Sequence, residues 1–299
     1  MSKFRYIVTE EDKGLPVKKL IRTKFSFSSR LMTKLKIQKL IYLNGEQVQG
    51  WITPEPGDVI TVELPEEKSD FPAEDIPITP VYEDDDIMII NKQPGVTVHP
   101  TKGHPCHTLA NGLMKYMEDT SQSFKIRFIN RLDMDTSGCI AVAKNSHAQD
   151  DFTKQMKANT TRKEYLAIVN GIVEEDDFTI NLPIGRPDPL DLRRRVMDDG
   201  YPSITHVHVV ERFKKDNGYT LIQLLLETGR THQIRVHMTH LGHILLGDKL
   251  YGDNSEKYIN RQALHAYRLS FKHPVTGEEI TAEAPLPSDM ERALEMLRE

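Results

Sequence analysis

Apolar residues recur along this chain with two periods, one typical of helices and one typical of strands. Residues 15–43 carry apolar side chains at helical spacing, and a serine-rich stretch at 26–29 interrupts them. This pattern predicts two short helices, since serine both breaks a helix and caps the next one. The same spacing returns at 109–117, 147–156 and 289–298, and predicts a helix in each place.

Short runs rich in β-branched and other apolar residues predict strands. They lie at 59–62, 87–90, 139–143, 166–169, 204–210 and 221–226. Asn44-Gly45 directly follows another short apolar stretch and predicts a hairpin turn. Helices and strands are mixed without a fixed repeat. The expected class is therefore α+β, with a mostly antiparallel mixed sheet preceded by a small α/β domain.

The distribution of charge divides the chain further. The 299 residues exceed the usual size of one domain, and the net charge of −5 hides a basic stretch at 18–39 that contains no acid. Acidic residues dominate from 63 to 86. We expect an N-terminal domain at 1–68, a solvated, proline-containing linker at 69–80 and a larger domain at 81–299.

The basic stretch predicts a docking surface for a polyanion. A local excess of positive charge attracts phosphate backbones, so Arg30, Lys34, Lys36 and Lys39 are predicted to bind RNA. The simpler interpretation is a solvated basic face without a partner.

The number of cysteines and the hydropathy of the chain indicate the cellular compartment in which the protein acts. The chain has only two cysteines, Cys106 and Cys139, which favours a reducing compartment over a disulfide scaffold. No charged-then-apolar leader precedes the first predicted element, and no apolar run reaches the roughly 18 residues that span a bilayer. We expect a cytoplasmic protein that needs no membrane. Nothing in the sequence indicates an obligate oligomer, so we expect a monomer.

A polar turn before the predicted strand at 139–143 is the strongest candidate for chemistry. It reads Asn130-Arg131-Leu132-Asp133-Met134-Asp135-Thr136-Ser137-Gly138. A turn fixed by a rigid strand can present a reactive group, and Asp133 is the predicted nucleophile. The alternative is that Asp133 only caps the turn.

Three further motifs accompany this turn in a fixed order. They lie at 85–100, at 163–171 around Tyr165, and at 227–252, where Gly229-Arg230-Thr231-His232 begins a longer run. Together the four motifs resemble the RluA/RluD-type pseudouridine synthase family from about residue 80 onward. The N-terminal part resembles the αL-type RNA-binding module shared by a ribosomal small-subunit protein and many RNA-modifying enzymes. The glycine that usually precedes the hairpin of that module is absent here.

The resemblance implies an isomerase that breaks the C1′–N1 bond of a uridine in RNA and rejoins the base through C5. It implies no metal and no other cofactor. Asp133 matches the catalytic aspartate, Arg230 the arginine paired with it, and Tyr165 the aromatic residue that stacks on the flipped base. Arg131 is expected to contact the RNA backbone or to fill the space that the base leaves. Family members with such a module mostly act on ribosomal RNA, which is the expected substrate ahead of tRNA.

Two places depart from the family pattern. Asn130 stands where the family has histidine, which predicts altered substrate contacts but intact chemistry. Gly200-Tyr201 stands where the family has Gly-Lys, so one basic contact is lost. Arg186 and the arginines at 193–195 could replace it by binding phosphate, or could belong to a solvated loop.

Two alternatives use other residues. A metal site is suggested by His99, His104, Cys106 and His107, and by the histidines at 237, 240 and 243. However, the chain lacks the HExxH and CxxC patterns, and resistance of the activity to chelators would exclude a metal-dependent hydrolase. The second alternative is a non-catalytic RNA-binding protein that kept the synthase fold.

Overall fold

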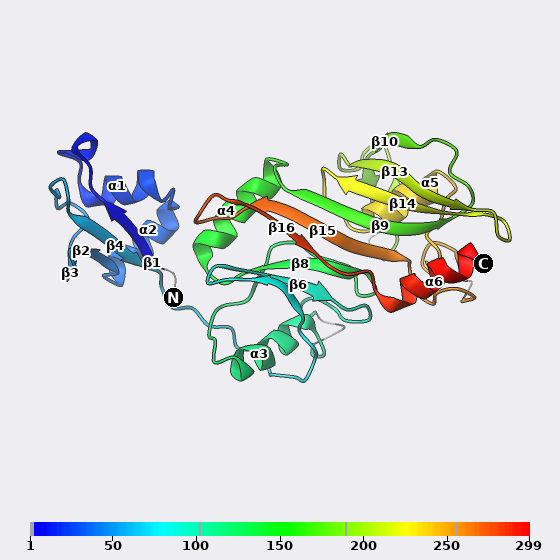
Figure 1. Ribbon diagram of the computed structural model, residues 1–299, viewed down its shortest axis with the longest axis horizontal. Coiled ribbons are helices and arrows are strands. Elements are labelled where there is room, and N and C mark those ends of the chain that lie inside the picture. The colour runs from blue at the N-terminus through cyan, green and yellow to red at the C-terminus, as the bar shows by residue number, and fades with distance from the viewer. Residues whose placement is uncertain (1–2, 102, 104, 189, 255) are drawn as a thin grey trace.

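A computed structural model describes residues 3–101, 103, 105–188, 190–254 and 256–299. The N-terminal part forms a four-stranded antiparallel sheet in the order β1-β4-β2-β3, covered by two helices (Figure 1). The elements are β1 Lys3–Ile7, α1 Val17–Lys24, α2 Ser29–Ile37, β2 Ile41–Leu43, β3 Glu46–Gln47 and β4 Val59–Glu63. A short 3-10 helix, Glu10–Asp12, lies between β1 and α1.

The predicted helix pair and hairpin are confirmed. The Ser28 hydroxyl accepts a hydrogen bond from the Leu31 amide at 3.3 Å and so caps α2. Asn44 and Gly45 have φ angles of 52° and 87°, and positive φ at both positions is what a two-residue hairpin turn requires. Apolar side chains from the helices and the sheet form a separate core here, which includes Phe4, Leu20 and Leu35.

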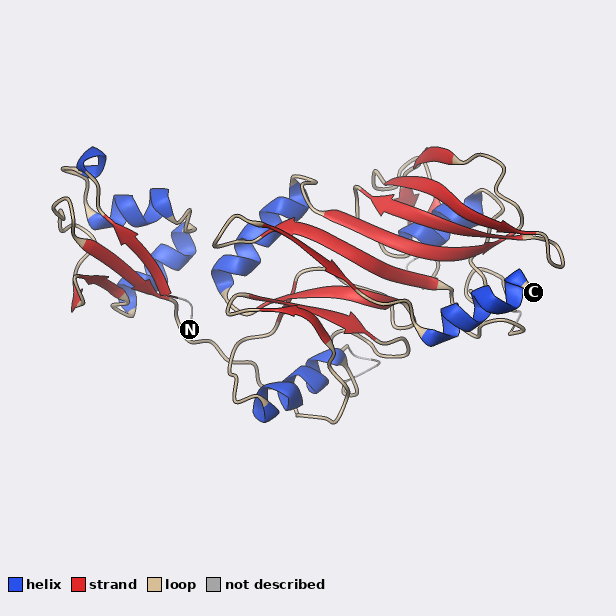
Figure 2. Cartoon of the chain, viewed as in Figure 1, coloured by secondary structure: helices blue, strands red, loops and turns tan. Residues whose placement is uncertain are grey.

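The larger part of the chain contains a ten-stranded mixed sheet, which Figure 2 shows extending across most of the molecule. Its main order is β10-β13-β14-β9-β15-β8-β6-β5, and β16 and β7 pair with β15 and β8. The strands are β5 Pro80–Glu83, β6 Ile87–Lys92, β7 Arg127–Phe128, β8 Ser137–Ala143, β9 Arg162–Asn170, β10 Asp177–Asn181, β13 Ile204–Phe213, β14 Tyr219–Leu226, β15 Leu264–Lys272 and β16 Glu279–Glu283. A separate two-stranded sheet consists of β11 Ile184–Gly185 and β12 Arg195–Val196.

Four helices accompany this sheet among the described residues: α3 Leu109–Asp119, α4 Ser146–Lys157, α5 Gln233–His240 and α6 Ser288–Arg298. The sequence pattern predicted α3, α4 and α6, but not α5. In the part of the chain that the structure describes, no helix has both the length and the apolar character needed to cross a bilayer.

One close contact fixes the middle of the sheet. β8 and β15 form its one parallel pair among the described strands, with Ser137 opposite His265 and Gly138 opposite Ala266. Gly138 has a φ of 108°, and a Cβ atom there would lie 2.2 Å from the Ala266 carbonyl oxygen. Only glycine fits this position. The predicted reactive turn therefore enters the sheet at a point where two backbones touch.

The segment between the two sheets is irregular, as expected, but it is not simply a solvated linker. The Ser69 hydroxyl accepts a hydrogen bond from the Ile126 amide, and the Pro72 carbonyl accepts one from the Asn111 side chain, both at 2.9 Å. The Glu74 carboxylate accepts the His107 amide at 3.0 Å. These bonds hold the segment against the larger part of the molecule.

The N-terminal part also contacts α4 directly, beside which it lies in Figure 1. The buried His147 ring on α4 packs edge-on against Phe4 and Phe27, with centroids 5.2 and 5.0 Å apart. Nearby, Lys34 Nζ lies 2.9 Å from Glu67 Oε1, and Glu67 also pairs with Arg127. An aromatic contact and an ion-pair chain thus fix how the two parts meet.

Candidate active site

The turn that precedes β8 is held by three donors to its backbone. The Thr136 amide donates to the Asp133 carbonyl at 3.1 Å, which closes the turn. The buried Lys92 ammonium donates to the Met134 carbonyl at 2.7 Å, and Arg261 Nη1 donates to the Asp135 carbonyl at 2.8 Å. Because its backbone is fixed, the turn can hold the partly exposed Asp133 side chain in one place.

Arg235, on α5, is the arginine that pairs with Asp133. Its Nη1 lies 2.8 Å from Asp133 Oδ2, while its Nε and Nη2 bind both oxygens of the buried Asp248 at 2.7 and 2.8 Å. Burial opposes the charge of Arg235, but the hydrogen bonds and charges of Asp248 and Asp133 outweigh it and raise the pKa of the guanidinium above its ordinary value. A permanent cation thus lies within hydrogen-bonding distance of the Asp133 carboxylate and fixes the position of Oδ2.

The prediction that Arg230 pairs with Asp133 is therefore wrong. Arg230 is exposed and precedes α5; its Nε donates to the Pro202 carbonyl at 3.3 Å, and its guanidinium lies over the Tyr201 ring. Arg235 lies within α5 among buried neighbours. An arginine buried in this way needs a buried acid, which Asp248 provides, and neither residue carries a local sequence signal for this pairing.

Tyr165 lines the same cleft as Asp133. It belongs to the central strand β9, and its side chain is 9% exposed. Burial, followed by the charge of Asp133, raises the pKa of the Tyr165 phenol well above its usual range. The phenol is therefore neutral at physiological pH, and the ring presents an apolar surface beside the carboxylate.

The cleft has a volume of about 1170 Å³ and is lined by both parts of the chain. Arg30 and Lys34 come from the N-terminal part, and Arg131 and Arg230 come from the larger part. Lys125, Arg127 and Lys163 add further positive charge. Lys36 and Lys39 are exposed but do not line this cleft. Of the residues predicted to bind RNA, Arg30, Lys34 and Arg131 therefore share the cleft with Asp133, and Lys36 and Lys39 do not.

The two departures from the expected motifs have local explanations. Asn130 bonds to β8, since its Oδ1 accepts the Ala141 amide at 2.8 Å and its Nδ2 donates to the Cys139 carbonyl at 3.2 Å. Tyr201 is exposed and lies against Arg230. Of the nearby arginines, Arg193 pairs with Asp191, so that its charge is partly satisfied.

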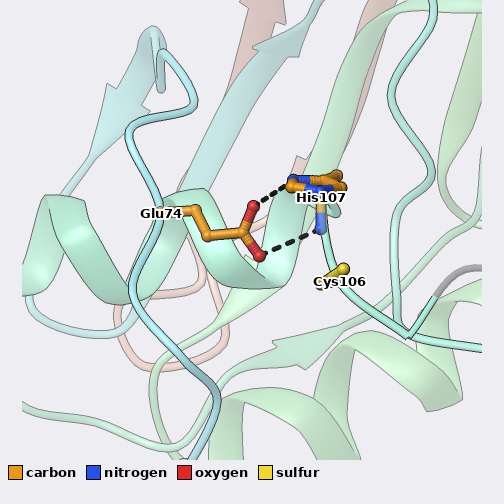
Figure 3. A group of neighbouring side chains, drawn as sticks. All are labelled: Glu74, Cys106 and His107. Atoms are coloured by element: carbon orange, nitrogen blue, oxygen red, sulfur yellow. Dashed lines mark hydrogen bonds and ion pairs between the residues drawn. The ribbon is translucent and has the colours of Figure 1, made fainter.

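Two groups of potential metal ligands occur among the described residues. Glu74, Cys106 and His107 have ligand atoms within 4.8 Å of one another, and Figure 3 shows the Glu74 carboxylate facing His107. The backbone and ring nitrogens of His107 already bond to that carboxylate. The second group is Asp84, Asp86 and His273. His104 lies outside the described residues.

The more C-terminal histidines do not form a ligand set. The buried His237 uses both ring nitrogens, one with the Thr205 hydroxyl at 2.9 Å and the other with the Leu182 carbonyl at 3.0 Å. Its neighbours along the chain, His240 and His243, belong to neither group of potential ligands in the described part of the chain.

Comparisons with known proteins point to one family. Residues 86–240 match the family model described as RNA pseudouridylate synthase. The chain is 40% identical to the uncharacterized RNA pseudouridine synthase YlyB of Bacillus subtilis, over 100% of this chain and 99% of that protein. It is also 40% identical to the ribosomal large subunit pseudouridine synthase D of Neisseria meningitidis serogroup A, over 86% of this chain and 68% of the relative.

A solved structure supports the fold. The human RNA pseudouridylate synthase domain containing 1 superimposes with a TM-score of 0.60 at 26% identity, covering 77% of this chain and 98% of that one. The expected α+β synthase fold is thereby confirmed. With a family match over more than half of its length and a relative that aligns along its whole length, the chain belongs to the RNA pseudouridine synthases of the RluA/RluD type.

Proposed function

We propose that this enzyme converts specific uridines in structured ribosomal RNA to pseudouridine, with Asp133 as the reacting carboxylate. The observation that carries the proposal is the pair of Asp133 and Arg235 in a cleft lined by basic residues. Relatives named as ribosomal large subunit pseudouridine synthases favour ribosomal RNA over tRNA.

The carboxylate of Asp133 can act in three ways. It can attack C1′ of the ribose, attack C6 of the base, or stabilise an oxocarbenium-like ion before a glycal forms. In each route the carboxylate has to face the reacting atom. Arg235 holds one of its oxygens from 2.8 Å.

The target uridine has to leave its base stack to reach Asp133. Its unstacked base then needs an aromatic surface, and the Tyr165 ring in the same cleft can provide one. Arg131, which is exposed and lines the cleft, is placed to contact the RNA backbone or to occupy the space that the base leaves.

The N-terminal domain would bind the RNA that flanks the target. Arg30 reaches the cleft, while Lys34 also pairs with Glu67; Lys36 and Lys39 extend the positive surface outside the cleft. The separate core of this part supports the division into 1–68, a connecting segment at 69–80 and a catalytic domain at 81–299. A monomer acting in the cytoplasm is part of the same proposal.

The test is to map pseudouridines in the RNA of a strain that lacks this protein. At least one site should disappear, return with the wild-type chain and stay absent with Asp133→Asn. Asp135→Asn is the matched control, because it changes a carboxylate in the same turn and should restore the site. A deletion strain that loses no site, or full restoration by Asp133→Asn, would contradict the proposal.

Purified protein provides the second test and separates the enzyme from a non-catalytic RNA-binding protein. The wild type should convert uridines in that RNA without an added cofactor. Binding of the RNA without conversion would instead support the non-catalytic alternative.

A further inference from the structure

The two oxygens of the Asp133 carboxylate have different surroundings. Arg235 Nη1 lies 2.8 Å from Oδ2, and His232 Nε2 lies 3.7 Å from the same oxygen. Among the residues that the structure describes, no donor forms a hydrogen bond to Oδ1. The carboxylate therefore has one oxygen that faces two protein groups and one oxygen that is left for the substrate.

The contact with Tyr251 favours one tautomer of His232. The Tyr251 hydroxyl accepts a hydrogen bond from the Arg194 amide at 2.9 Å and lies 3.0 Å from His232 Nδ1. The backbone amide can only donate, so the phenolic hydrogen is available for Nδ1. Nδ1 then accepts, and the hydrogen of the neutral imidazole lies on Nε2, the nitrogen that faces Asp133.

Burial keeps the imidazole in this neutral form. It lowers the pKa of His232, and the charge of Asp133 opposes this effect only in part. The charged or titratable groups that act on the ring are Asp133, Arg235, Arg194, Asp248 and Tyr251. The Tyr251 ring lies edge-on to His232 and also beneath the Arg235 guanidinium, so one side chain supports both groups that face Oδ2.

The backbone of His232 is held in an unfavourable conformation. Its φ is 59°, in the left-handed region that residues other than glycine rarely occupy. The next residue fixes this conformation, because the Gln233 side chain accepts the Arg230 amide at 3.0 Å and donates to the Ile204 carbonyl at 2.9 Å. Strain of this kind is often found at functional sites.

We propose that His232 is a positioning residue, whose Nε2–H donates to Asp133 Oδ2 in the RNA complex and leaves Oδ1 facing the uridine. The 3.7 Å separation is longer than a hydrogen bond, and contacts of this type commonly shorten when substrate binds. This inference rests on the proposed function of Asp133. It adds that Arg235 and His232 together fix the orientation of the carboxylate.

Three substitutions separate positioning from structure. His232→Gln keeps an N–H donor near the place of Nε2. His232→Asn tolerates a positive φ, but its amide is too short to reach Asp133. His232→Ala removes the donor entirely. The readouts are the single-turnover rate and the dissociation constant for the RNA segment that wild-type protein converts, together with the thermal midpoint of each variant.

We expect His232→Ala and His232→Asn to lower the single-turnover rate roughly 10- to 100-fold, the effect of losing a hydrogen bond to a charged group, with RNA affinity unchanged. His232→Gln should recover most of the rate. Wild-type rates in all three variants would overturn the inference, as would a His232→Gln enzyme that folds normally but is as slow as His232→Ala.

Tyr251→Phe gives an independent reading if the His232 variants fold poorly. It keeps the ring against His232 and Arg235 but no longer selects the tautomer. We expect its single-turnover rate to fall with unchanged RNA affinity, and an unchanged rate would count against the inference. Failure of the proposed function itself would look different, because the wild-type chain would then convert no uridine.

Discussion

Arg235 and Asp133 are 102 positions apart in the sequence, and yet the arginine donates to the carboxylate at 2.8 Å. The same guanidinium binds both oxygens of Asp248, which is almost completely buried. One side chain therefore connects the turn around Asp133 to the segment that follows α5.

The first prediction compares Arg235 with Arg230. Arg235→Gln leaves Asp248 buried without its cation, and breaking a buried pair in this way costs about 3–5 kcal/mol of stability. It should also lower the single-turnover rate, because Asp133 loses its cation. Arg230→Gln is the control: its exposed side chain should leave both stability and rate unchanged and weaken RNA binding only. Denaturant titration and single-turnover assays measure both effects, and equal rate losses in the two variants would contradict the assignment.

The second prediction concerns the salt dependence of RNA binding. Replacing Arg30, Lys36 or Lys39 with glutamine should in each case weaken RNA binding. It should also flatten the slope of log affinity against log salt concentration, because the variant releases fewer counterions when it binds. Lys34→Gln should change the slope less, since Lys34 already pairs with Glu67 at 2.9 Å. Filter-binding titrations over a range of salt concentrations give the slopes. Unchanged slopes in the first three variants would show that RNA docks elsewhere.

The third prediction concerns the contact between the two domains. His147→Ala removes the ring that packs against Phe4 and Phe27, and aromatic pairs of this kind contribute about 0.5–1.5 kcal/mol each. We expect faster proteolysis of the connecting segment and weaker RNA binding, with an unchanged rate at saturating RNA. Lys154→Ala, on the exposed side of the same helix, is the matched control. Identical proteolysis of the two variants would mean that the contact does not hold the domains together.

The fourth prediction concerns Lys92 and pH. Burial lowers the pKa of Lys92 from 10.5 to about 7. Between these values the unfolded chain binds more protons than the folded chain, so the contribution of Lys92 to the free energy of unfolding rises with pH, by up to about 1.4 kcal/mol per unit. Below pH 7 both states are protonated, and the full cost of burying the charge is present.

Lys92→Met lacks this titration. The difference in unfolding free energy between wild type and Lys92→Met should therefore shift in favour of the wild type as pH rises from 7 to 10. Denaturation should be followed by circular dichroism rather than by tryptophan fluorescence. The single tryptophan, Trp51, lies in the N-terminal part of the chain, away from Lys92. A difference that stays constant over this range would contradict the prediction.

The sequence predicted elements that have one buried face. α4 and α6 alternate buried and exposed residues, so their apolar spacing is visible, and the second half of α3 turns from buried to exposed. α5 was missed because its first six residues are all buried, polar ones included, and no periodic pattern remains. The Asn44-Gly45 turn was predicted because its signal is local.

Only those parts of the site that have a local sequence signal were predicted. The turn around Asp133 has a local signature, whereas the choice between Arg230 and Arg235 depends on where α5 begins and on the distant Asp248. No local pattern contains that information. The opposite surroundings of the two Asp133 oxygens likewise arise only from the folded arrangement.

The parallel contact of β8 with β15 also has a consequence for when the proposed active site can form during protein synthesis. Ser137 reaches its partner His265 across 128 positions, and Gly138 lies against Ala266. A growing chain therefore contains Asp133 long before it contains the strand that completes the sheet around it. We therefore expect the proposed site to form late in folding, so that a chain that stops short of β15 would carry the intact motif around Asp133 without the sheet that holds it.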